Sequence, residues 1–502
     1  MHRNIVGLAL FILVTVLSSA SAQSAPVPVA GGEIVVAIAA EPPGWDPTAS
    51  TSQEIARVVY HNVYEGLVRF DGDGRIVPAL AESWSWSEDR RRLRFVVRRG
   101  VLFHDGTPLT LGDIVTKFER ARDPSSGHTN SAYYQAIETI ERDEEANAVT
   151  FVLSRPSRTL LYDLARPDSI IYPAGAVETQ RSRPIGTGPF RFADYREGTE
   201  VRLERFEDYY LSGVPYLDAA TFRILSDPNT RFAALLAGDI DLIGTSLTPE
   251  QFLQARSTDG IVATEGSATT EITMALNTSR APLDDVRVRR AITHAIDKAA
   301  IVEGAMFGLG TIIGTHMSPA EPYYLDLSDT YPYDPDMARE LLAEAGYPDG
   351  FELVFELPEP YALERRAGLV VAEQLEAVGI EVDLRIVEWA TWIQRIFLGA
   401  EYQATIIGHS EPRDIGIYAD PSYYYRYDNP AIGELLARAE AAPSPEAERA
   451  AYQEIARIIA DDAVNVWLFS PPYLVAARSD IHGFWTDQPT PAIDLTEVYR
   501  SR

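Results

Sequence analysis

The sequence predicts an α/β protein built from more than one lobe. The chain has 502 residues, which is more than a single hydrophobic core usually holds. Hydrophobic residues make up 46% of it and charged residues 23%, as in ordinary globular proteins. Short β-type runs alternate with segments that carry a helical apolar stripe. This alternation is typical of sheets whose faces are covered by helices.

The clearest group of elements lies between residues 81 and 124. Residues 92–98 alternate basic and apolar side chains as a β-strand does, and the Asp-Gly-Thr-Pro run at 105–108 predicts a tight turn. Thr110 is placed to cap the helix that follows, with Asp113 in its first turn, where a negative charge suits the helix dipole. The apolar face of this helix consists of Ile114, Phe118 and Ala121.

The same patterns predict the elements of the remaining chain. Further strands are expected at residues 33–39, 149–153, 201–205, 221–225, 272–277, 351–356, 381–387, 403–407 and 464–469. Helices are expected at residues 52–67, 230–237, from 284 onward, 334–342, 362–378, 390–398 and 443–460. Asp284 and Asp334 are the expected caps of two of these helices, and Gly238 and Gly346 are expected to end two of them.

Two glycine-containing runs resemble ion-binding loops but lack the residues such loops need. Residues 71–74 read Asp-Gly-Asp-Gly without the distal glutamate of a calcium loop, so a hairpin turn is predicted there. Gly186, Thr187 and Gly188 are not followed by the Lys-Ser/Thr pair of a phosphate-binding loop.

The N-terminus has the pattern of a secretory signal. His2 and Arg3 precede an apolar run at residues 5–17, and Ala20 and Ala22 form a small-residue cleavage site. We expect cleavage after Ala22, because the apolar run is too short for a membrane span. The chain has no cysteine, which excludes a lipidated thiol after the signal and any cysteine-based metal site or nucleophile.

Composition and motifs argue against several other functions. The formal net charge of −29 makes nucleic acid an improbable partner, since phosphate binding needs clustered Lys and Arg. The nearest match to a Gly-x-Ser-x-Gly elbow, residues 408–412, ends in proline, and no paired zinc-ligand spacing occurs. The sequence therefore predicts a protein without catalytic residues, metal ligands or cofactor, although the eight histidines could still meet in space.

Several separated motifs resemble the peptide/nickel-type (family 5) solute-binding proteins of ABC transporters, including dipeptide- and oligopeptide-binding proteins. The matching segments are residues 64–67, 80–84, 103–114, 186–190, 213–217, 282–289 and 334–347. The resemblance implies a two-lobe periplasmic binding protein-like fold, of the large class with an extra subdomain, whose lobes are joined by a hinge. Many relatives are lipoproteins, but without cysteine this protein is expected to be free in the periplasm.

The resemblance also implies a division of the chain. After a signal peptide at residues 1–22, lobe I is expected to comprise residues 23–48, 182–276 and 480–502. An extra subdomain of lobe I is expected at residues 49–181, and lobe II at residues 277–479.

In the family both lobes line a ligand cleft, and four aromatic residues match such positions. Trp45 lies where the chain leaves the first sheet, so it is either a cleft residue or a residue that packs a loop on the core. On the second lobe Trp389 and Trp392 match cleft positions, and Tyr473 matches one more loosely.

The loop at residues 407–418 departs from the family pattern. Peptide-binding members carry Gly-Trp-x-x-Asp there, and the aspartate pairs with the peptide ammonium group. Here His409 stands at the tryptophan position and Pro412 at the aspartate position, so Glu411 or Asp414 is the expected substitute. An acid buried in a cleft without a partner would be costly, so it implies a cationic ligand group or an arginine. Tyr418 begins a tyrosine-rich stretch that could suit an adaptable pocket.

The function that follows from the resemblance is capture of a small peptide or peptide-like solute by hinge closure and its delivery to the permease subunits of an ABC importer. The protein is expected to act as a monomer. An opine, a sugar derivative or a metal chelate remains an alternative ligand, and a chaperone or signalling relative an alternative class.

Overall fold

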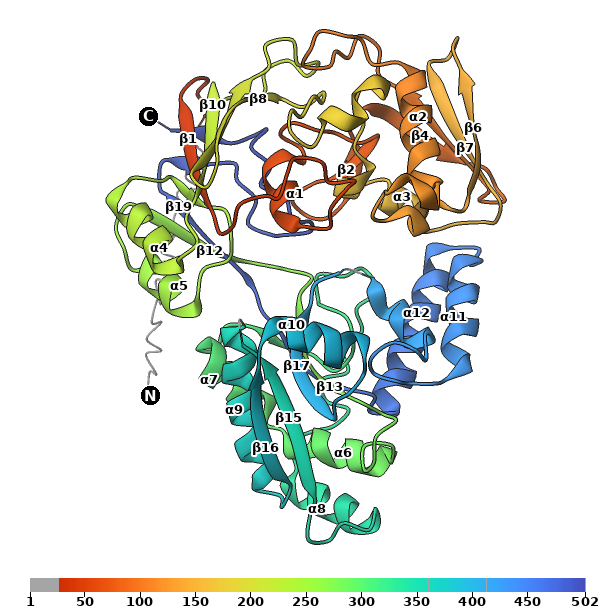
Figure 1. The fold of residues 1–502 in the computed structure, drawn as a ribbon, viewed down its shortest axis with the longest axis vertical. Helices are drawn as coiled ribbons and strands as arrows, with labels where there is room; N and C mark the ends of the chain where they lie inside the picture. The colour runs from red at the N-terminus through yellow and green to blue at the C-terminus, as the bar shows by residue number, and fades with distance from the viewer. Residues whose placement is uncertain (1–26, 360, 412, 502) are drawn as a thin grey trace, which may run out of the picture.

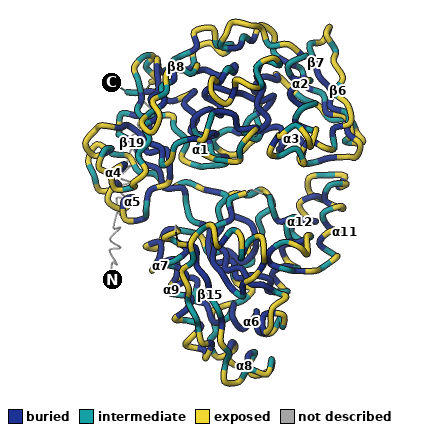
Figure 2. The backbone as a smooth tube through the Cα atoms, viewed as in Figure 1, coloured by how far each residue is buried: buried dark blue, intermediate teal, exposed yellow. Residues whose placement is uncertain are grey.

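The computed structural model describes residues 27–359, 361–411 and 413–501 and shows two lobes joined by a narrow waist (Figure 1). Lobe I contains a seven-stranded sheet and a separate four-stranded sheet, and lobe II contains a six-stranded sheet. The predicted signal segment lies outside the described residues. Buried residues fill the interior of both lobes (Figure 2). No helix in the described part of the chain is both long and apolar enough to span a membrane.

The main sheet of lobe I is assembled from distant parts of the chain. Its strand order is β12 (Ile261–Gly266), β19 (Tyr473–Arg478), β11 (Leu242–Ile243), β1 (Glu33–Ile38), β10 (Ala219–Ile224), β9 (Glu200–Arg205) and β8 (Phe190–Arg196). β1 pairs in parallel with β10 and β11, and the other pairs are antiparallel. α4 (Pro228–Ala237) and α5 (Pro249–Arg256) cover one face, and α1 (Gln53–Val59) and the C-terminal segment cover the other.

The extra subdomain of lobe I is a four-stranded antiparallel sheet with one long helix across it (Figure 1). Its strands are β4 (Ala81–Trp86), β5 (Arg92–Val97), β7 (Ala148–Leu153) and β6 (Ile137–Asp143), and its helix is α2 (Leu111–Arg122). The predicted Thr110 cap of α2 is confirmed, because the Asp113 amide donates to the Thr110 side chain. The Thr110 amide also donates to the Asp113 carboxylate, which completes a capping box. The short helix α3 (Leu160–Asp163) follows β7.

The Asp-Gly-Asp-Gly turn and the Gly-Thr-Gly run both have structural roles. Residues 71–75 close the hairpin of β2 (Val68–Phe70) and β3 (Ile76–Pro78), as predicted. Gly186 and Gly188 lie directly against the backbone of residues 62–63, where an added Cβ would come within 2.0 and 2.4 Å of a carbonyl oxygen. Thr187 between them donates to the buried Glu65 carboxylate at 2.9 Å. This run is therefore a packing contact between two segments.

Lobe II is a mixed sheet covered by helices on both faces. Its strand order is β14 (Thr311–Ile312), β18 (Val466–Ser470), β13 (Glu271–Leu276), β17 (Ala404–His409), β15 (Glu352–Pro358) and β16 (Glu381–Val387). One face packs on α6 (Val286–Ala295), α7 (Lys298–Met306), α8 (Pro335–Glu344) and α9 (Ala362–Glu376). The other packs on η5 (Trp392–Leu398), η6 (Asp414–Ala419), α11 (Pro430–Glu440) and α12 (Pro445–Asp461).

The sheets correct the predicted lobe boundaries at both crossings. β13 pairs with β17 and β18 of lobe II, so the first crossing lies between Gly266 and Glu271 and precedes the predicted boundary at 276/277. β19 pairs with β11 and β12 of lobe I, so the return precedes the predicted boundary at 479/480. The sequence of a buried strand does not reveal which sheet it joins, because pairing partners are set by the fold.

Three predicted helices differ in detail from the structure. The helix expected at residues 52–67 ends at Val59, because Tyr60 is already extended and His61 then adopts a left-handed φ of 68°. The Asn62 side chain then holds this turn by donating to Val58 and Ile493. α6 is capped by Asp285 instead of Asp284. The helix expected at 390–398 is a single turn, α10 (Trp389–Thr391), followed by the wider π-type turns of η5.

Candidate ligand-binding cleft

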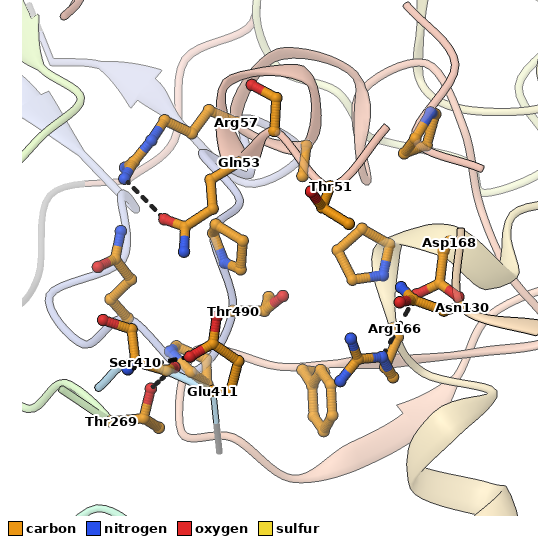
Figure 3. A pocket seen from close by; sticks show the side chains of 18 of the residues that line it. Thr51, Gln53, Arg57, Asn130, Arg166, Asp168, Thr269, Ser410, Glu411 and Thr490 are labelled. Atoms are coloured by element: carbon orange, nitrogen blue, oxygen red, sulfur yellow. Dashed lines mark hydrogen bonds and ion pairs between the residues drawn. The ribbon is translucent and has the colours of Figure 1, made fainter. Parts of the chain in front are cut away.

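A cavity of about 400 Å³ lies where the two lobes face each other (Figure 3). Lobe I contributes the loop and start of α1, the segment before and after α3, and a C-terminal loop. Lobe II contributes the end of its β17 loop, and the first crossing supplies a threonine pair. The lining residues used below are Thr51, Asn130, Arg166, Thr269, Ser410, Glu411 and Thr490.

A second cavity of about 530 Å³ shares a wall with the first. Both are lined by Phe70, Tyr162, Thr269, Gln488 and Pro489. The second one also contacts the β2–β3 hairpin, Trp84, Glu321 and Arg413. The space between the lobes is therefore longer than the first cavity alone.

Arg166 is the basic group of the first cavity whose terminal nitrogens remain available. Its Nε donates to Asp168 at 3.3 Å, and its guanidinium carbon lies 4.5 Å from the centre of the Tyr133 ring. No other described side chain accepts a hydrogen bond from its two Nη groups. Arg57, the other arginine of this cavity, already bonds Glu54, Gln53 and the Gly244 carbonyl.

Glu411 is the acidic counterpart on lobe II. Its side chain accepts only a long 3.4 Å hydrogen bond from the Ser410 amide, and no basic group of the described chain lies within ion-pair distance. Figure 3 shows Arg166 and Glu411 entering the cavity from different sides. The cavity therefore presents one available cation and one available anion.

Asp414, three residues farther along, already has an internal cation. Its Oδ1 lies 2.7 Å from Nε2 of His316, and Glu271 Oε1 lies 2.6 Å from the other nitrogen of that imidazole ring. Burial opposes charge on Asp414, but His316 outweighs it and holds the pKa of Asp414 well below its usual range. Burial likewise opposes charge on His316, but the two carboxylates raise its pKa well above the usual value.

The loop that carries Glu411 is also held by Arg413. The Arg413 amide donates to Glu321 at 2.7 Å, and the Arg413 side chain extends to lobe I. There the guanidinium lies 4.1 Å from the centre of the Tyr162 ring of α3. This cation–π contact joins the two lobes beside the cavity.

Comparison with known proteins identifies the family. A sequence profile described as Bacterial extracellular solute-binding proteins, family 5 Middle, matches residues 75–429. This chain belongs to the family 5 extracellular solute-binding proteins. The two-lobe α/β fold expected from the sequence motifs is thereby confirmed.

Relatives of this family 5 protein include binders of different solutes. A "Heme-binding protein A" of Haemophilus influenzae is 33% identical over 75% of this chain and 74% of its own. A "Probable di/tripeptide-binding protein 5" of Pseudomonas aeruginosa is 29% identical over 91% of this chain and 94% of its own. A solved structure of the Helicobacter pylori periplasmic binding protein DppA "in complex with peptide STSA" superposes with a TM-score of 0.78 at 26% identity, covering 94% of this chain and 99% of that one.

Of the predicted site residues of this family 5 protein, Glu411 lines the cavity and the other seven lie elsewhere. Trp45 is 3% exposed and packs against Phe192 and Tyr195, so it holds a loop on the lobe I core. Tyr473 lies in β19 and is 7% exposed within the same core.

Apart from Glu411, the predicted residues of lobe II line neither cavity, and most of them pack in the lobe interior. Trp389 stacks on Trp392, which is buried and donates to Thr405 at 3.0 Å. His409 faces inward and contacts the Tyr424 and Tyr425 hydroxyl groups. Tyr418 is buried and accepts from Asn465. The tyrosine-rich stretch is therefore largely packed interior, and neither of the two cavities is lined by it.

Sequence reasoning missed Arg166 and the small polar residues at 50–53. Arg166 lies in a connection after α3 without any recognisable motif, and the serine–threonine stretch has the composition of an ordinary loop. Only the Pro167 that follows marks the Arg166 connection as a turn. Arg166 and residues 50–53 line the cavity because of the surface that lobe I turns toward lobe II.

Proposed function

We propose that this protein captures a short peptide, or a peptide-like zwitterion, between its lobes and delivers it unaltered to the permease of an ABC importer. The observation that carries the proposal is that Arg166 of lobe I and Glu411 of lobe II line the same cavity. Each of the two side chains has unused hydrogen-bonding capacity. Family membership supports the transport role.

Glu411 would bind the ammonium group and Arg166 the carboxylate. Charge-assisted hydrogen bonds of this kind are roughly twice as strong as neutral ones. A ligand that carries both charges would bridge the lobes, so it would favour the closed arrangement by its higher affinity for that state. Thr51, Asn130, Ser410 and Thr490 supply neutral donors and acceptors for the amide groups between the two ends.

The size of the cavity suits a small solute. At about 400 Å³ it falls within the usual range of ligand pockets, roughly 300–1,000 Å³. The name of the Pseudomonas relative, a di/tripeptide-binding protein, agrees with a ligand of this size. We further propose that the signal peptide at residues 1–22 is removed and that the mature protein acts as a monomer in the periplasm.

Calorimetric titration with dipeptides and tripeptides tests this function. Alanyl-alanine and trialanine are compared with their N-acetylated and C-amidated forms. We expect binding of at least one free peptide and a loss of about tenfold or more on blocking either end, because each block removes a charged hydrogen bond of about 1.5–3 kcal/mol.

Two matched substitutions test the roles of the residues. Glu411→Gln should weaken free peptides but not N-acetylated ones, and Arg166→Gln should weaken free peptides but not C-amidated ones. Glu401→Gln and Arg457→Gln, at exposed sites away from the cavity, serve as controls. Equal affinity of the wild type for blocked and free peptides would contradict the proposed charge pairing.

A larger conjugated solute is a second candidate ligand. The adjoining cavity of about 530 Å³ offers the aromatic rings of Phe70, Trp84 and Tyr162 beside Arg413, and one relative carries the name of a heme-binding protein. Titration with hemin, followed by its visible absorption, separates this candidate from the first. Saturable hemin binding without any peptide binding would favour it.

A further inference from the structure

Three potential metal ligands meet behind the cavity wall of lobe II. They are His316, which follows β14, His409 at the end of β17, and Asp414 at the start of η6. One ligand atom from each lies within 4.8 Å of the others. His316 and His409 are 1% and 8% exposed, so the ligand atoms come from three segments that converge in the interior.

The separations are close to those of a coordinated ion. His316 Nε2 lies 2.7 Å from Asp414 Oδ1, and His409 Nδ1 lies 3.8 Å from Asp414 Oδ2. Tetrahedral zinc with bonds of about 2.0–2.2 Å places its ligand atoms roughly 3.4 Å apart. The two His–Asp separations differ from this spacing by about 0.7 and 0.4 Å, and all three ligand atoms lie within 4.8 Å of one another.

A second layer of groups orients both imidazole rings. Glu271, 3% exposed, contacts His316 Nδ1 at 2.6 Å, which leaves Nε2 turned toward Asp414. The hydroxyl groups of Tyr424 and Tyr425 lie 3.1 and 2.7 Å from His409 Nε2, which leaves Nδ1 turned the same way. Carboxylate–histidine–metal arrangements of this kind fix the tautomer in established metal sites.

We propose that His316 Nε2, His409 Nδ1 and the Asp414 carboxylate bind one divalent transition-metal ion, with Zn²⁺ the ion they fit best. Two imidazoles and one carboxylate match its ligand preference, and water would complete the tetrahedron. The ion would displace the Nε2 proton of the His316 imidazolium, so that binding releases a proton. The site is separate from the solute cavity, because none of its three ligands lines that cavity. It lies on the same loop as Ser410 and Glu411, so a bound ion would tie this loop to β17 and to the β14 connection.

Metal titration of the full-length mature protein, produced without a histidine tag and stripped with EDTA, tests the proposal. With ZnCl₂ we expect one equivalent to bind and the melting temperature to rise. His316→Gln and Asp414→Asn should each weaken zinc by at least 100-fold, and Glu271→Gln by about 10- to 100-fold. His294→Gln, which changes a histidine far from the cluster on α6, should leave zinc binding unchanged.

A measurement on the wild type guards against variants that fail to fold. Co²⁺ in a tetrahedral nitrogen–oxygen site gives intense visible absorption, which we expect to appear at one equivalent and to disappear when Zn²⁺ is added. Absence of saturable zinc binding, or zinc binding that survives in a folded His316→Gln/Asp414→Asn double variant, would overturn the proposal. Peptide titration of the EDTA-treated protein is a separate measurement, so either proposal can fail alone.

Discussion

At the scale of single residues, the acidic groups of this protein differ mainly in which partners surround them. Asp414 lies against an internal imidazolium and stays ionised, whereas Glu411, three residues earlier, faces the cavity without a cation. Glu65 is a third case. It is 3% exposed and accepts hydrogen bonds from the hydroxyl groups of Thr187, Tyr209 and Tyr210. Burial outweighs these three hydroxyls and raises the pKa of Glu65 to about 7.

The raised pKa of Glu65 predicts that this residue lowers the free energy of unfolding as pH rises, which a neutral residue would not do. Between the unfolded value of 4.5 and the folded value of about 7, the folded state binds the extra proton, so the free energy of unfolding falls as pH rises through this window. The shift corresponds to about 3 kcal/mol at pH 8. Glu65→Gln should therefore gain about that much stability relative to the wild type between pH 4 and pH 8.

Urea unfolding of both proteins at pH 4, 6 and 8 measures this difference. The histidines and other acids also titrate in this range, but they are present in both proteins and cancel in the comparison. A stability difference that stays constant across the three pH values would contradict the assignment of a raised pKa to Glu65.

At the scale of elements, local signals determine where several helices begin. The Thr110–Asp113 capping box at the start of α2 and the Asp334–Pro335 start of α8 both form as their sequences predict. The end of α1 is different, because nothing in its sequence shows that Asn62 bonds the C-terminal segment.

Removal of the α2 cap should have a moderate effect. Thr110→Ala leaves the Asp113 amide without its acceptor and should lower the free energy of unfolding by about 1 kcal/mol. Thr110→Ser keeps the hydroxyl group and is the matched control, with an expected loss well below that of alanine. Chemical denaturation measures both, and equal stability of the wild type and the alanine variant would show that the cap contributes nothing.

At the scale of the whole molecule, the lobes touch at the end of the cleft far from the waist. Arg158, between β7 and α3, donates to the Ala442 carbonyl at 2.8 Å and to Glu448 of α12 at 3.2 Å. Tyr323 donates to the same glutamate at 2.5 Å. The Arg158 and Glu448 side chains are only 4% and 8% exposed, so this pair is buried while the lobes are closed. Figure 1 shows α12 beneath the extra subdomain at this point.

Loss of Arg158 should shift the protein toward an open arrangement. Removal of one partner of a buried ion pair costs about 3–5 kcal/mol where the other stays buried, and opening relieves that cost by exposing Glu448 to water. Arg158→Gln should therefore increase the radius of gyration measured by small-angle X-ray scattering. It should also lower the affinity for the bound solute by on the order of 100-fold. Arg457→Gln, which changes an exposed arginine on α12, the helix that carries Glu448, is the control. Identical scattering from the wild type and Arg158→Gln would show that the Arg158–Glu448 ion pair does not hold the lobes closed.

The sequence alone determined the α/β class, most strands, the caps of α2 and α8 and the family, because these depend on local periodicity, turn residues and motifs that lie within one segment. It also pointed to Glu411 through the altered loop at residues 407–418. Tertiary structure decided the remainder: Trp45 and Tyr473 became core residues, Asp414 gained His316 as its partner, and Arg166 entered the cavity. These outcomes depend on contacts between segments that lie about 100 or more residues apart in the chain. Such contacts leave no periodic or local trace in the sequence.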